Sequence, residues 1–325
     1  MASRANKIAE SINSSCDIDS RLELLNSVGG LTETSVQNSE WLYMLEEDTR
    51  QSLAIEGVFA TEAELKATLS GRKTAPEIEN YYRVAQGMYD QALQNKRSGE
   101  LVLHTGLVRH VHSELFRAIS HKRGEFRRGA IRIQGAKVTP PVHDSDAYVK
   151  AWLQITRDYT RTLEPIAALA RSHALFESIH PFEDGNGRAG RILLNYLSIS
   201  LGLPPIVIKG FTVQERTRYY AALEAADTGL HEAFPAPNPA KLKAALENGD
   251  FASLELLLCE GVRPRLDALI AGAVERKAGL KDLRALAEEF GVQEVTLRQW
   301  VIRDKLIAVK RGKKLYSHSS LRLEK

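Results

Sequence analysis

The sequence is poor in the features that mark several protein classes. Its only two cysteines, Cys16 and Cys259, lie far apart and flank no motif, which excludes a framework of disulfides and a cysteine-rich metal site. No run of about 18 apolar residues occurs, so we expect no membrane span. The first 20 residues lack the apolar stretch of a signal peptide. We therefore expect a protein of a reducing compartment, the cytoplasm, with no membrane partner.

Composition is ordinary, but charge is unevenly distributed. Of the 325 residues, 43% are hydrophobic and 26% are charged, which excludes a disordered or collagen-like chain and predicts two or three domains. The net charge of +3 conceals a division. Residues 261–325 hold 15 Lys and Arg against 8 Asp and Glu, a net charge of +7, whereas the first 260 residues carry −4. This division predicts two regions with different roles.

Apolar residues spaced three and four apart predict a mostly α fold. The segments expected to be helical are 40–56, 61–69, 75–95, 99–119, 145–160, 162–178, 189–201, 213–226, 239–247 and 251–259. Two short hairpins are expected, over 130–138 around Gly135 and over 306–317 around Gly312. The proline-rich stretch FPAPNP, residues 234–239, predicts the end of a domain near residue 235.

Residues 179–194, IHPFEDGNGRAGRILL, carry the clearest chemical signal. Pro181 ends one helix, and a glycine-rich loop leads into the next, which is expected to start near Arg188. Such a loop presents free backbone N–H groups and the positive end of a helix dipole, an arrangement that binds phosphate. Arg188 and Arg191, three residues apart, add two guanidinium groups, and two cations indicate a polyphosphate.

Two further side chains suit nucleotide chemistry. His180, at the rim of this loop, can act as a general base near neutral pH. Asp184 offers a hard carboxylate of the kind that holds Mg²⁺ together with a nucleotide. A histidine at a helix end, or a lone Gly-Asn-Gly, would by itself indicate only a cap or a turn, but packing does not explain all of these residues within one loop.

The stretch HPFEDGNGRAGR resembles the signature of the Fic (filamentation induced by cAMP) family, H-x-F-x-[DE]-G-N-G-R-x-x-R. The matching positions are His180, Phe182, Asp184, Gly185, Asn186, Gly187, Arg188 and Arg191. Residues 124–141 resemble the family's target-holding flap hairpin, and residues 211–229 resemble the helix after the signature. The resemblance covers about residues 40–230 and implies a Fic-like helical core with a β-hairpin flap.

The resemblance implies transfer of AMP from ATP to a Ser, Thr or Tyr hydroxyl of a target protein, the chain itself included. His180 would take the hydroxyl proton, Asp184 would hold Mg²⁺ or Mn²⁺, and Arg191 would bind the γ-phosphate. The α- and β-phosphates would lie on Gly185, Asn186, Gly187 and Arg188. Donors such as UTP, GTP or a CDP-linked compound stay open, as does a homodimer.

Other positions follow from the same resemblance. Tyr219 and Tyr220 would flank the adenosine, and Asp227 stands where some relatives carry Asn near the base. The flap residues that would hold the target are Ile131, Arg132, Ile133, Gln134 and Gly135. His104, His110 and His112 lie close together, but we expect core or surface histidines rather than a metal site.

The stretch SLAIEG, residues 52–57, resembles the family's inhibitory motif [ST]-x-x-x-E-[GN]. Ser52 and Glu56 are spaced to share one face of a helix, and Gly57 suits its C-terminus. The resemblance implies that Glu56 pairs with Arg191 and so blocks the γ-phosphate. In some relatives the same glutamate also serves removal of AMP, and this role stays open.

The C-terminal residues predict a helix-turn-helix with a basic hairpin, which resembles a winged helix. The recognition helix would present Gln293, Thr296, Arg298, Gln299 and Arg303, and the wing Lys310, Arg311, Lys313 and Lys314. Such a module binds DNA or a protein, and both readings stay open. The alternative to an enzyme is thus a DNA-binding regulator with the Fic core as a nucleotide sensor.

We expect four regions. The N-terminal helical region is 1–98, with an inhibitory helix near 40–57, and the Fic catalytic core is 99–235. A helical connector, 236–278, leads to a winged helix at 279–325.

Overall fold

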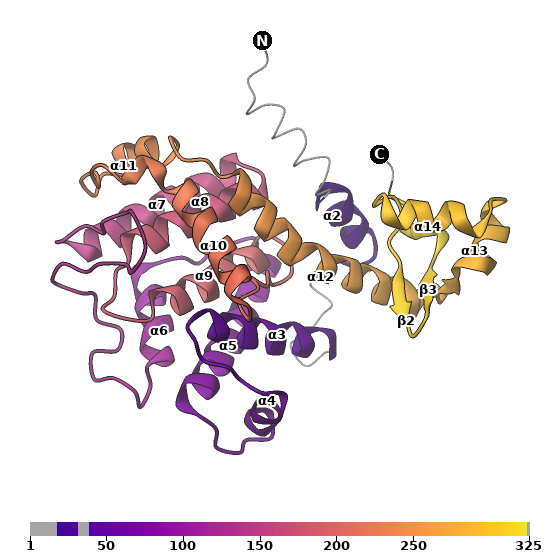
Figure 1. The fold of residues 1–325 in the computed structure, drawn as a ribbon, viewed down its shortest axis with the longest axis horizontal. Helices are drawn as coiled ribbons and strands as arrows, with labels where there is room; N and C mark the ends of the chain where they lie inside the picture. Colours follow the sequence, from indigo (N-terminus) through magenta and orange to yellow (C-terminus); the bar gives the residue numbers. More distant parts are fainter. Residues whose placement is uncertain (1–17, 32–38, 324–325) are drawn as a thin grey trace, which may run out of the picture.

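The structure is a computed structural model that describes residues 18–31 and 39–323. Helices dominate it, as the sequence predicts, and its few strands lie near the C-terminus (Figure 1). The α-helices of the first part are α2 (Ile18–Ser27), α3 (Ser39–Ile55), α4 (Glu62–Leu69), α5 (Pro76–Ser98), α6 (Thr105–Leu115), α7 (Ser145–Thr162), α8 (Pro165–Ile179), α9 (Asn186–Ser200), α10 (Val213–Ala226) and α11 (Pro239–Leu246). A short 3₁₀ turn, η2 (Thr228–Leu230), follows α10.

Local sequence signals set many of these helix boundaries. Thr61 and Thr212 each form a capping box with a glutamate three residues later, which starts α4 and α10. The helices α5, α8 and α11 each begin with a proline, whose missing N–H costs nothing in the first turn. The helix α8 ends at Ile179, as the position of Pro181 predicts.

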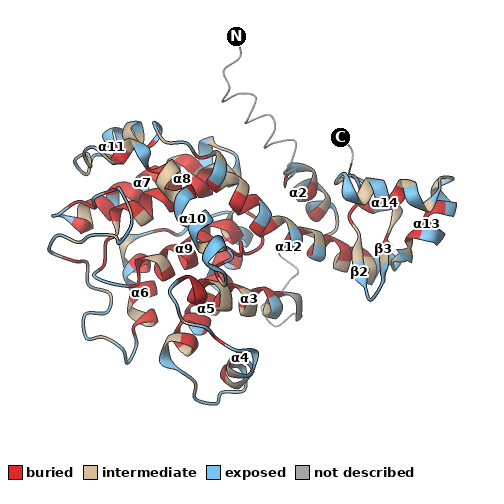
Figure 2. Cartoon of the chain, in the orientation of Figure 1, coloured by how far each residue is buried: buried red, intermediate tan, exposed pale blue. Residues whose placement is uncertain are grey.

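The helix α9 lies at the centre of the helical body. Nearly all of its residues are buried (Figure 2), and it packs against α5, α8, α6 and α3. The hydroxyl of Tyr89 on α5 and the amide of Asn195 on α9 both contact the buried carboxylate of Asp48, on α3. Tyr81, also on α5, donates a further hydrogen bond to Asp48. The core thus fixes α3 beside α9.

Two sequence predictions in the middle of the chain are wrong in detail. The helix expected over 99–119 is only α6, because His104 caps its N-terminus and accepts from the N–H of Leu107. Residues 130–138, here called the flap segment, form no paired strands. They make a single turn, in which the N–H of Ala136 donates to the carbonyl of Ile133. The described residues supply no neighbouring strand that could pair with the flap segment.

The helix α12 (Ala252–Ala278) is far longer than the predicted segment 251–259. It continues through Pro264, because the carbonyl that loses its donor belongs to the exposed Glu260 and can bind water instead. It packs against α2, α8 and α10 and then extends to the C-terminal unit, residues 279–323 (Figure 1). The predicted connector is therefore in part a component of the helical body.

The C-terminal unit combines two short helices with a small sheet. Its elements are β1 (Lys281–Asp282), α13 (Leu283–Phe290), α14 (Glu294–Ile302), β2 (Val309–Arg311), β3 (Lys314–Ser317) and the 3₁₀ turn η3 (Ser319–Leu321). The antiparallel strands follow the order β1-β3-β2. Gly291 and Gly312, both with positive φ, form the turn between the helices and the turn of the hairpin, as the sequence predicts.

Two findings concern the absences noted in the sequence. None of the described helices is both long and apolar enough to span a bilayer. Cys259, buried on α12, is disulfide-bonded, and Cys16 lies outside the described residues. The sequence argument excluded a framework of several bridges but did not predict this single bond.

Candidate functional site

The predicted chemical residues meet at a cleft of about 840 Å³. Its walls are the end of α8, the loop into α9, the first turn of α9, the helix α10, the flap segment and Glu56. The predicted site residues that line it are Glu56, Ile131, Arg132, Ile133, Gln134, Gly135, His180, Asp184, Gly185, Asn186, Gly187, Arg191, Tyr219, Tyr220 and Asp227. A volume of this size accommodates a nucleotide.

His180 lies directly after α8 and adopts the left-handed conformation, with φ 50° and ψ 60°. Its Nδ1 lies 3.1 Å from the carbonyl oxygen of Glu177. A carbonyl only accepts, so the proton resides on Nδ1, and Nε2 is left with a lone pair. Burial lowers the pKa of His180 below its ordinary value. The imidazole is thus neutral near pH 7 and is suited to accept a proton from a ligand in the cleft.

The loop 182–187 leads into α9 with its backbone facing the cleft. Gly185 has φ 74°, and a Cβ there would lie 2.2 Å from the ring of Phe116, so only glycine fits. No described side chain caps the N-terminus of α9. Its first N–H groups, at 186–188, are therefore available to an anion, which the helix dipole also favours.

Two residues of the signature lie differently from the sequence prediction. The side chain of Asn186 is buried and forms two hydrogen bonds with the backbone of Phe182, so only its N–H can serve a ligand. Arg188 lies over the ring of Phe116 and 3.5 Å from a carboxylate oxygen of Asp184. It does not line the cleft, so the two guanidinium groups of Arg188 and Arg191 do not face the same space.

Arg191 is buried and held by the segment 52–57. Its Nε donates to the hydroxyl of Ser52 at 2.6 Å, and its Nη2 donates to the backbone carbonyl of Ser52 and to Glu56 Oε1, the latter also at 2.6 Å. Burial alone would raise the pKa of Glu56, but the adjacent guanidinium outweighs it and lowers that pKa. Both groups are thus charged at neutral pH, and the pair is a charge-assisted bond.

Gly187 allows this ion pair to lie against the start of α9. A Cβ at Gly187 would lie 2.6 Å from Glu56 Oε1 and 2.9 Å from Arg191 Nη1. The pair therefore occupies the space directly beside the free N–H groups of α9. An anion bound at that helix start would compete with the carboxylate of Glu56 for Arg191.

The two tyrosines of α10 have different surroundings. Tyr219 is buried, and its hydroxyl lies 2.7 Å from Nε2 of His173. Tyr220 is 51% exposed and donates to the carbonyl of Ile55. The exposed ring of Tyr220 can therefore stack on a planar ligand, whereas Tyr219 forms part of the wall.

Asp227 is buried at the end of α10. Its carboxylate accepts from the hydroxyl of Ser178 at 3.1 Å and lies 2.6 Å from Nε2 of His231. Burial raises the pKa of Asp227. These two contacts occupy the carboxylate from the protein side and fix its orientation in the cleft wall.

Asp184 is the candidate metal ligand. Its side chain is 73% exposed, and its Oδ1 accepts from the N–H of Gly185. The described residues contain no group of three His, Cys, Asp or Glu side chains that could hold a metal ion by themselves. Mg²⁺ commonly binds through one or two carboxylates with phosphates and water as the other ligands. A single exposed carboxylate beside an uncapped helix start fits that mode.

Sequence reasoning assigned no role at the site to three residues around this loop, of which it named only His112, as a core or surface histidine. Glu177 lines the cleft, and burial raises its pKa to about 7. His112 accepts from the N–H of Gly124, so its Nε2 carries the proton and donates to the carbonyl of Asp184. Arg127 contacts the carbonyl of His180. Only the stretch GEFRRG, assigned to the flap, gave any signal for these contacts.

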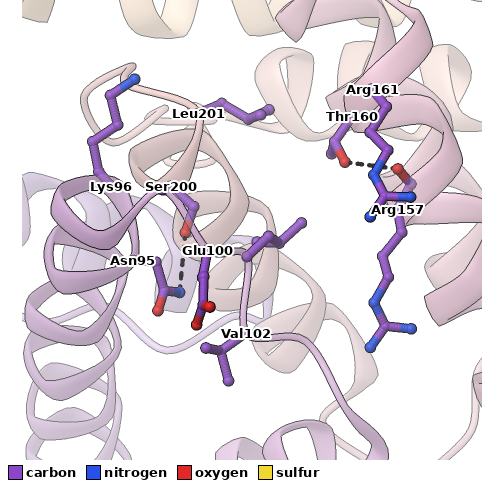
Figure 3. A pocket seen from close by; sticks show the side chains of 11 residues that line it. Asn95, Lys96, Glu100, Val102, Arg157, Thr160, Arg161, Ser200 and Leu201 are labelled. Atoms are coloured by element: carbon purple, nitrogen blue, oxygen red, sulfur yellow. Dashed lines mark hydrogen bonds between the residues drawn. The ribbon is translucent and has the colours of Figure 1, made fainter.

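A second cleft, of about 590 Å³, lies away from these residues (Figure 3). Its labelled side chains come from the C-terminal parts of α5, α7 and α9 and from the residues that follow α5 and α9, Glu100, Val102 and Leu201. Lys96 and Arg161 lie in the last turns of α5 and α7, where the negative ends of the helix dipoles stabilise cations, and Arg157 donates to the carbonyl of Leu103. This accounts for the residues of the second cleft without a ligand.

Comparison with known proteins agrees with this geometry. Residues 102–198 match the model of the Fic/DOC family. A probable protein adenylyltransferase of Aquifex aeolicus is 30% identical over 191 residues, which cover 58% of this chain and 56% of that protein. A protein adenylyltransferase Fic of Drosophila willistoni is 37% identical over 109 residues, 33% of this chain and 21% of that protein. The chain thus spans little more than half of the first relative and a smaller part of the second.

Solved structures show the same fold. A Fic-domain-containing signaling protein from Bacteroides thetaiotaomicron superposes with a TM-score of 0.58, over 78% of this chain and 97% of that one, at 19% identity. A Fic family protein from Desulfovibrio desulfuricans superposes with a TM-score of 0.53, over 98% and 97%, also at 19% identity. Residues 102–198, which contain His180 and the loop into α9, thus match the Fic/DOC family model, and the chain shares the fold of these two solved structures.

Proposed function

We propose that the protein is a protein adenylyltransferase that moves AMP from ATP to a hydroxyl group of a target protein. One observation carries this proposal. A neutral histidine, a free helix N-terminus and a buried arginine face one cleft of nucleotide size. The relatives named protein adenylyltransferases support the same reaction.

The reaction needs one proton acceptor and an aligned triphosphate. Nε2 of His180 takes the proton of the target's Ser, Thr or Tyr hydroxyl while that oxygen forms a bond to the α-phosphorus. The bond from the α-phosphorus to the bridging oxygen breaks, and diphosphate leaves. The N–H groups at the start of α9 stabilise the charge on the α- and β-phosphates, and alignment provides much of the rate enhancement.

Arg191 binds the γ-phosphate in this proposal, and Tyr220 stacks on the adenine. Asp184 holds Mg²⁺ or Mn²⁺, which neutralises phosphate charge when bound. The flap segment pairs with the target segment, because no strand of residues 18–31 or 39–323 pairs with its backbone groups. Arg188 assists from beside Asp184 rather than from the cleft wall.

The segment 52–57 restrains this activity. With Glu56 bound to Arg191, the γ-phosphate loses its cation, and the α-phosphate is not placed in line with the hydroxyl. The support is the buried contact of Arg191 with Ser52 and Glu56. In the same geometry, the carboxylate of Glu56 would also be available to activate a water molecule that removes AMP from a modified target.

Mass spectrometry tests the reaction. Glu56→Gly protein is incubated with ATP and Mg²⁺, with the doubly substituted Glu56→Gly/His180→Ala protein as the matched control. The proposal predicts a gain of one or more AMP units that depends on His180. The same incubation is repeated with a cell extract as a source of target proteins. If ATP binds but neither the chain nor any protein of the extract gains mass, the proposal is contradicted.

The second candidate is a DNA-binding regulator. The C-terminal unit carries the exposed wing lysines Lys310 and Lys313, for which no ion pair is found among the described residues. Four other cations of the unit are paired with carboxylates: Lys281 with Glu289, Arg298 with Glu294 and Lys314 with Asp282 within the unit, and Arg311 with Glu275 of α12. All four carboxylates are already counted in the net charge of +7 of residues 261–325, so these pairs leave that net charge unchanged. A salt-dependent shift of DNA that survives His180→Ala would support this candidate.

We also propose that the chain divides into a catalytic core at 99–235 and a winged helix at 279–325. The support is the unit of two helices and three strands at the end of α12. We also propose a cytoplasmic location, which cell fractionation tests, and a homodimer, which light scattering tests.

A further inference from the structure

The backbone around His180 depends on one buried side chain that the reaction does not use. Because His180 interrupts the helix, the last carbonyl groups of α8 have no helical donors. Arg127 Nη2 donates to the carbonyl of Ile179 at 3.1 Å, and its Nε donates to the carbonyl of His180 at 2.7 Å. Its own backbone N–H donates to the carbonyl of Pro181 at 2.9 Å. One residue thus satisfies three successive carbonyls at the catalytic histidine.

Arg127 is itself fixed by its surroundings. It is only 5% exposed, and its carbonyl accepts from the hydroxyl of Ser145 at the start of α7. Its Nη1 donates to the carbonyl of Gly129 at 2.7 Å. No carboxylate among the described residues pairs with the guanidinium, so its side-chain hydrogen bonds go to backbone carbonyls. A buried cation is costly, and a simple structural contact could use a neutral donor.

The position of Arg127 in the chain links two parts of the cleft. Gly129, held by the same guanidinium, lies directly before the flap segment. Only arginine has a planar fork that reaches carbonyls of two separate segments at once. The side chain of Arg127 therefore joins the residue before the flap segment directly to the backbone of His180.

We propose that Arg127 is a positioning residue: it fixes the backbone at His180 relative to the flap segment, so that the imidazole faces a hydroxyl held there. This inference rests on the proposed function, but the contacts of Arg127 exist without nucleotide or target. Displacement of a catalytic group by about 1 Å can cost about 100-fold in rate. We expect loss of the Arg127 guanidinium to reduce turnover strongly. Nucleotide binding should change little, because other contacts hold the start of α9.

A spectroscopic signature accompanies the proposal. Burial lowers the pKa of His180, the hydrogen bond to the Glu177 carbonyl raises it, and the charge of Arg127 lowers it. The other charged groups near the imidazole, Glu56 and Asp184, both raise this pKa. Neutralising Arg127 should therefore move the His180 titration to higher pH.

The test compares Arg127→Gln and Arg127→Lys with Arg123→Gln, all in the Glu56→Gly background. Arg123 is exposed and precedes Arg127 by four residues, so its replacement is a matched loss of charge. We expect kcat for AMP transfer to fall about 10- to 100-fold in Arg127→Gln, with KM for ATP within about two-fold. Arg127→Lys, which can serve one carbonyl, should recover part of kcat, and Arg123→Gln should match its parent.

Two results would overturn the proposal: an unchanged kcat in folded Arg127→Gln, or a rise of KM for ATP with kcat unchanged. The His180 imidazole resonance, followed by NMR in nucleotide-free protein, gives an independent answer. An upward shift in Arg127→Gln relative to Arg123→Gln supports the proposal, and Arg127→Lys should stay near the parent because it keeps its charge. An unshifted resonance in Arg127→Gln contradicts the proposal. If Glu56→Gly protein with Arg127 intact transfers no AMP, the proposed function fails, while this titration still decides the role of Arg127.

Discussion

Oε1 of Glu56 lies 2.6 Å from Nη2 of Arg191, and the same arginine donates to the hydroxyl of Ser52. The arginine belongs to the central helix α9, and both of its partners belong to the end of α3, or directly follow it. The arginine of α9 that lines the cleft is thus occupied by a carboxylate 135 residues away in the chain. Anything that moves α3 alters the charge available to a triphosphate.

Ser52→Ala should release this restraint in part. The substitution removes the hydrogen bond from Nε of Arg191 but leaves Glu56 in place. Loss of one such bond costs about 1 kcal/mol, which corresponds to about a five-fold change in an equilibrium. We expect AMP incorporation to rise about five-fold over wild type, and less than in Glu56→Gly. Incorporation at the wild-type level in a labelled-ATP assay would show that Ser52 does not contribute.

Glu47→Gln should loosen α3 from its other side. Glu47 lies within hydrogen-bond distance of the buried Arg265 on α12, with an Nη2-to-Oε2 distance of 2.5 Å. Loss of the charged partner of a buried cation costs more than the roughly 1 kcal/mol of an exposed ion pair, up to about 3–5 kcal/mol. We expect a modest rise in AMP incorporation, smaller than that of Glu56→Gly, and none when Glu56→Gly is already present. If Glu47→Gln raised AMP incorporation further in Glu56→Gly protein, the effect of Glu47 could not depend on Glu56.

Asp48→Ala should destabilise the fold. The buried carboxylate accepts from Tyr81, Tyr89 and Asn195, and the substitution leaves these donors without an acceptor. We expect the free energy of unfolding to fall by about 2–4 kcal/mol in chemical denaturation. Asp90→Ala, an exposed carboxylate on α5, is the control and should change it by less than about 0.5 kcal/mol. Equal effects in the two variants would contradict the role assigned to Asp48.

The pH profile should report the neutral state of His180. Burial lowers its pKa below the ordinary 6.5, so the imidazole is protonated, and unable to accept a proton, only at acid pH. AMP transfer by Glu56→Gly protein should therefore be constant through neutral pH and fall as pH drops below about 6.5. A profile that declines already from pH 8 to 7 would contradict His180 as the base in this environment.

The sequence predicts the site better than it predicts the surrounding structure. The loop 180–191 is contiguous, so its glycines, His180 and Arg191 are readable as one pattern, and the spacing of Ser52 and Glu56 indicates a shared face. The contact between these two segments arises only from packing of α3 on α9. Arg127 and His112 act through backbone carbonyls of a distant loop, and no periodicity in the sequence encodes such contacts.

The errors in secondary structure have local physical causes. Alternating residues in the flap segment resemble a strand, but a strand needs a partner, and the described residues provide none there. Pro264 normally ends a helix, but α12 continues because the affected carbonyl faces water and packing against α8 and α10 holds the helix on both sides. Tertiary contacts overrode the local signal in both places.

The central claim is that the Glu56–Arg191 ion pair restrains a His180-dependent transfer of AMP. The most direct measurement is the rate of AMP incorporation from α-phosphate-labelled ATP by wild type, Glu56→Gly and Glu56→Gly/His180→Ala protein at equal concentration. A charge-assisted hydrogen bond of about 1.5–3 kcal/mol predicts a rate about 10- to 100-fold higher in Glu56→Gly than in wild type. The doubly substituted protein should incorporate none. Equal rates in wild type and Glu56→Gly, or incorporation without His180, would contradict the account.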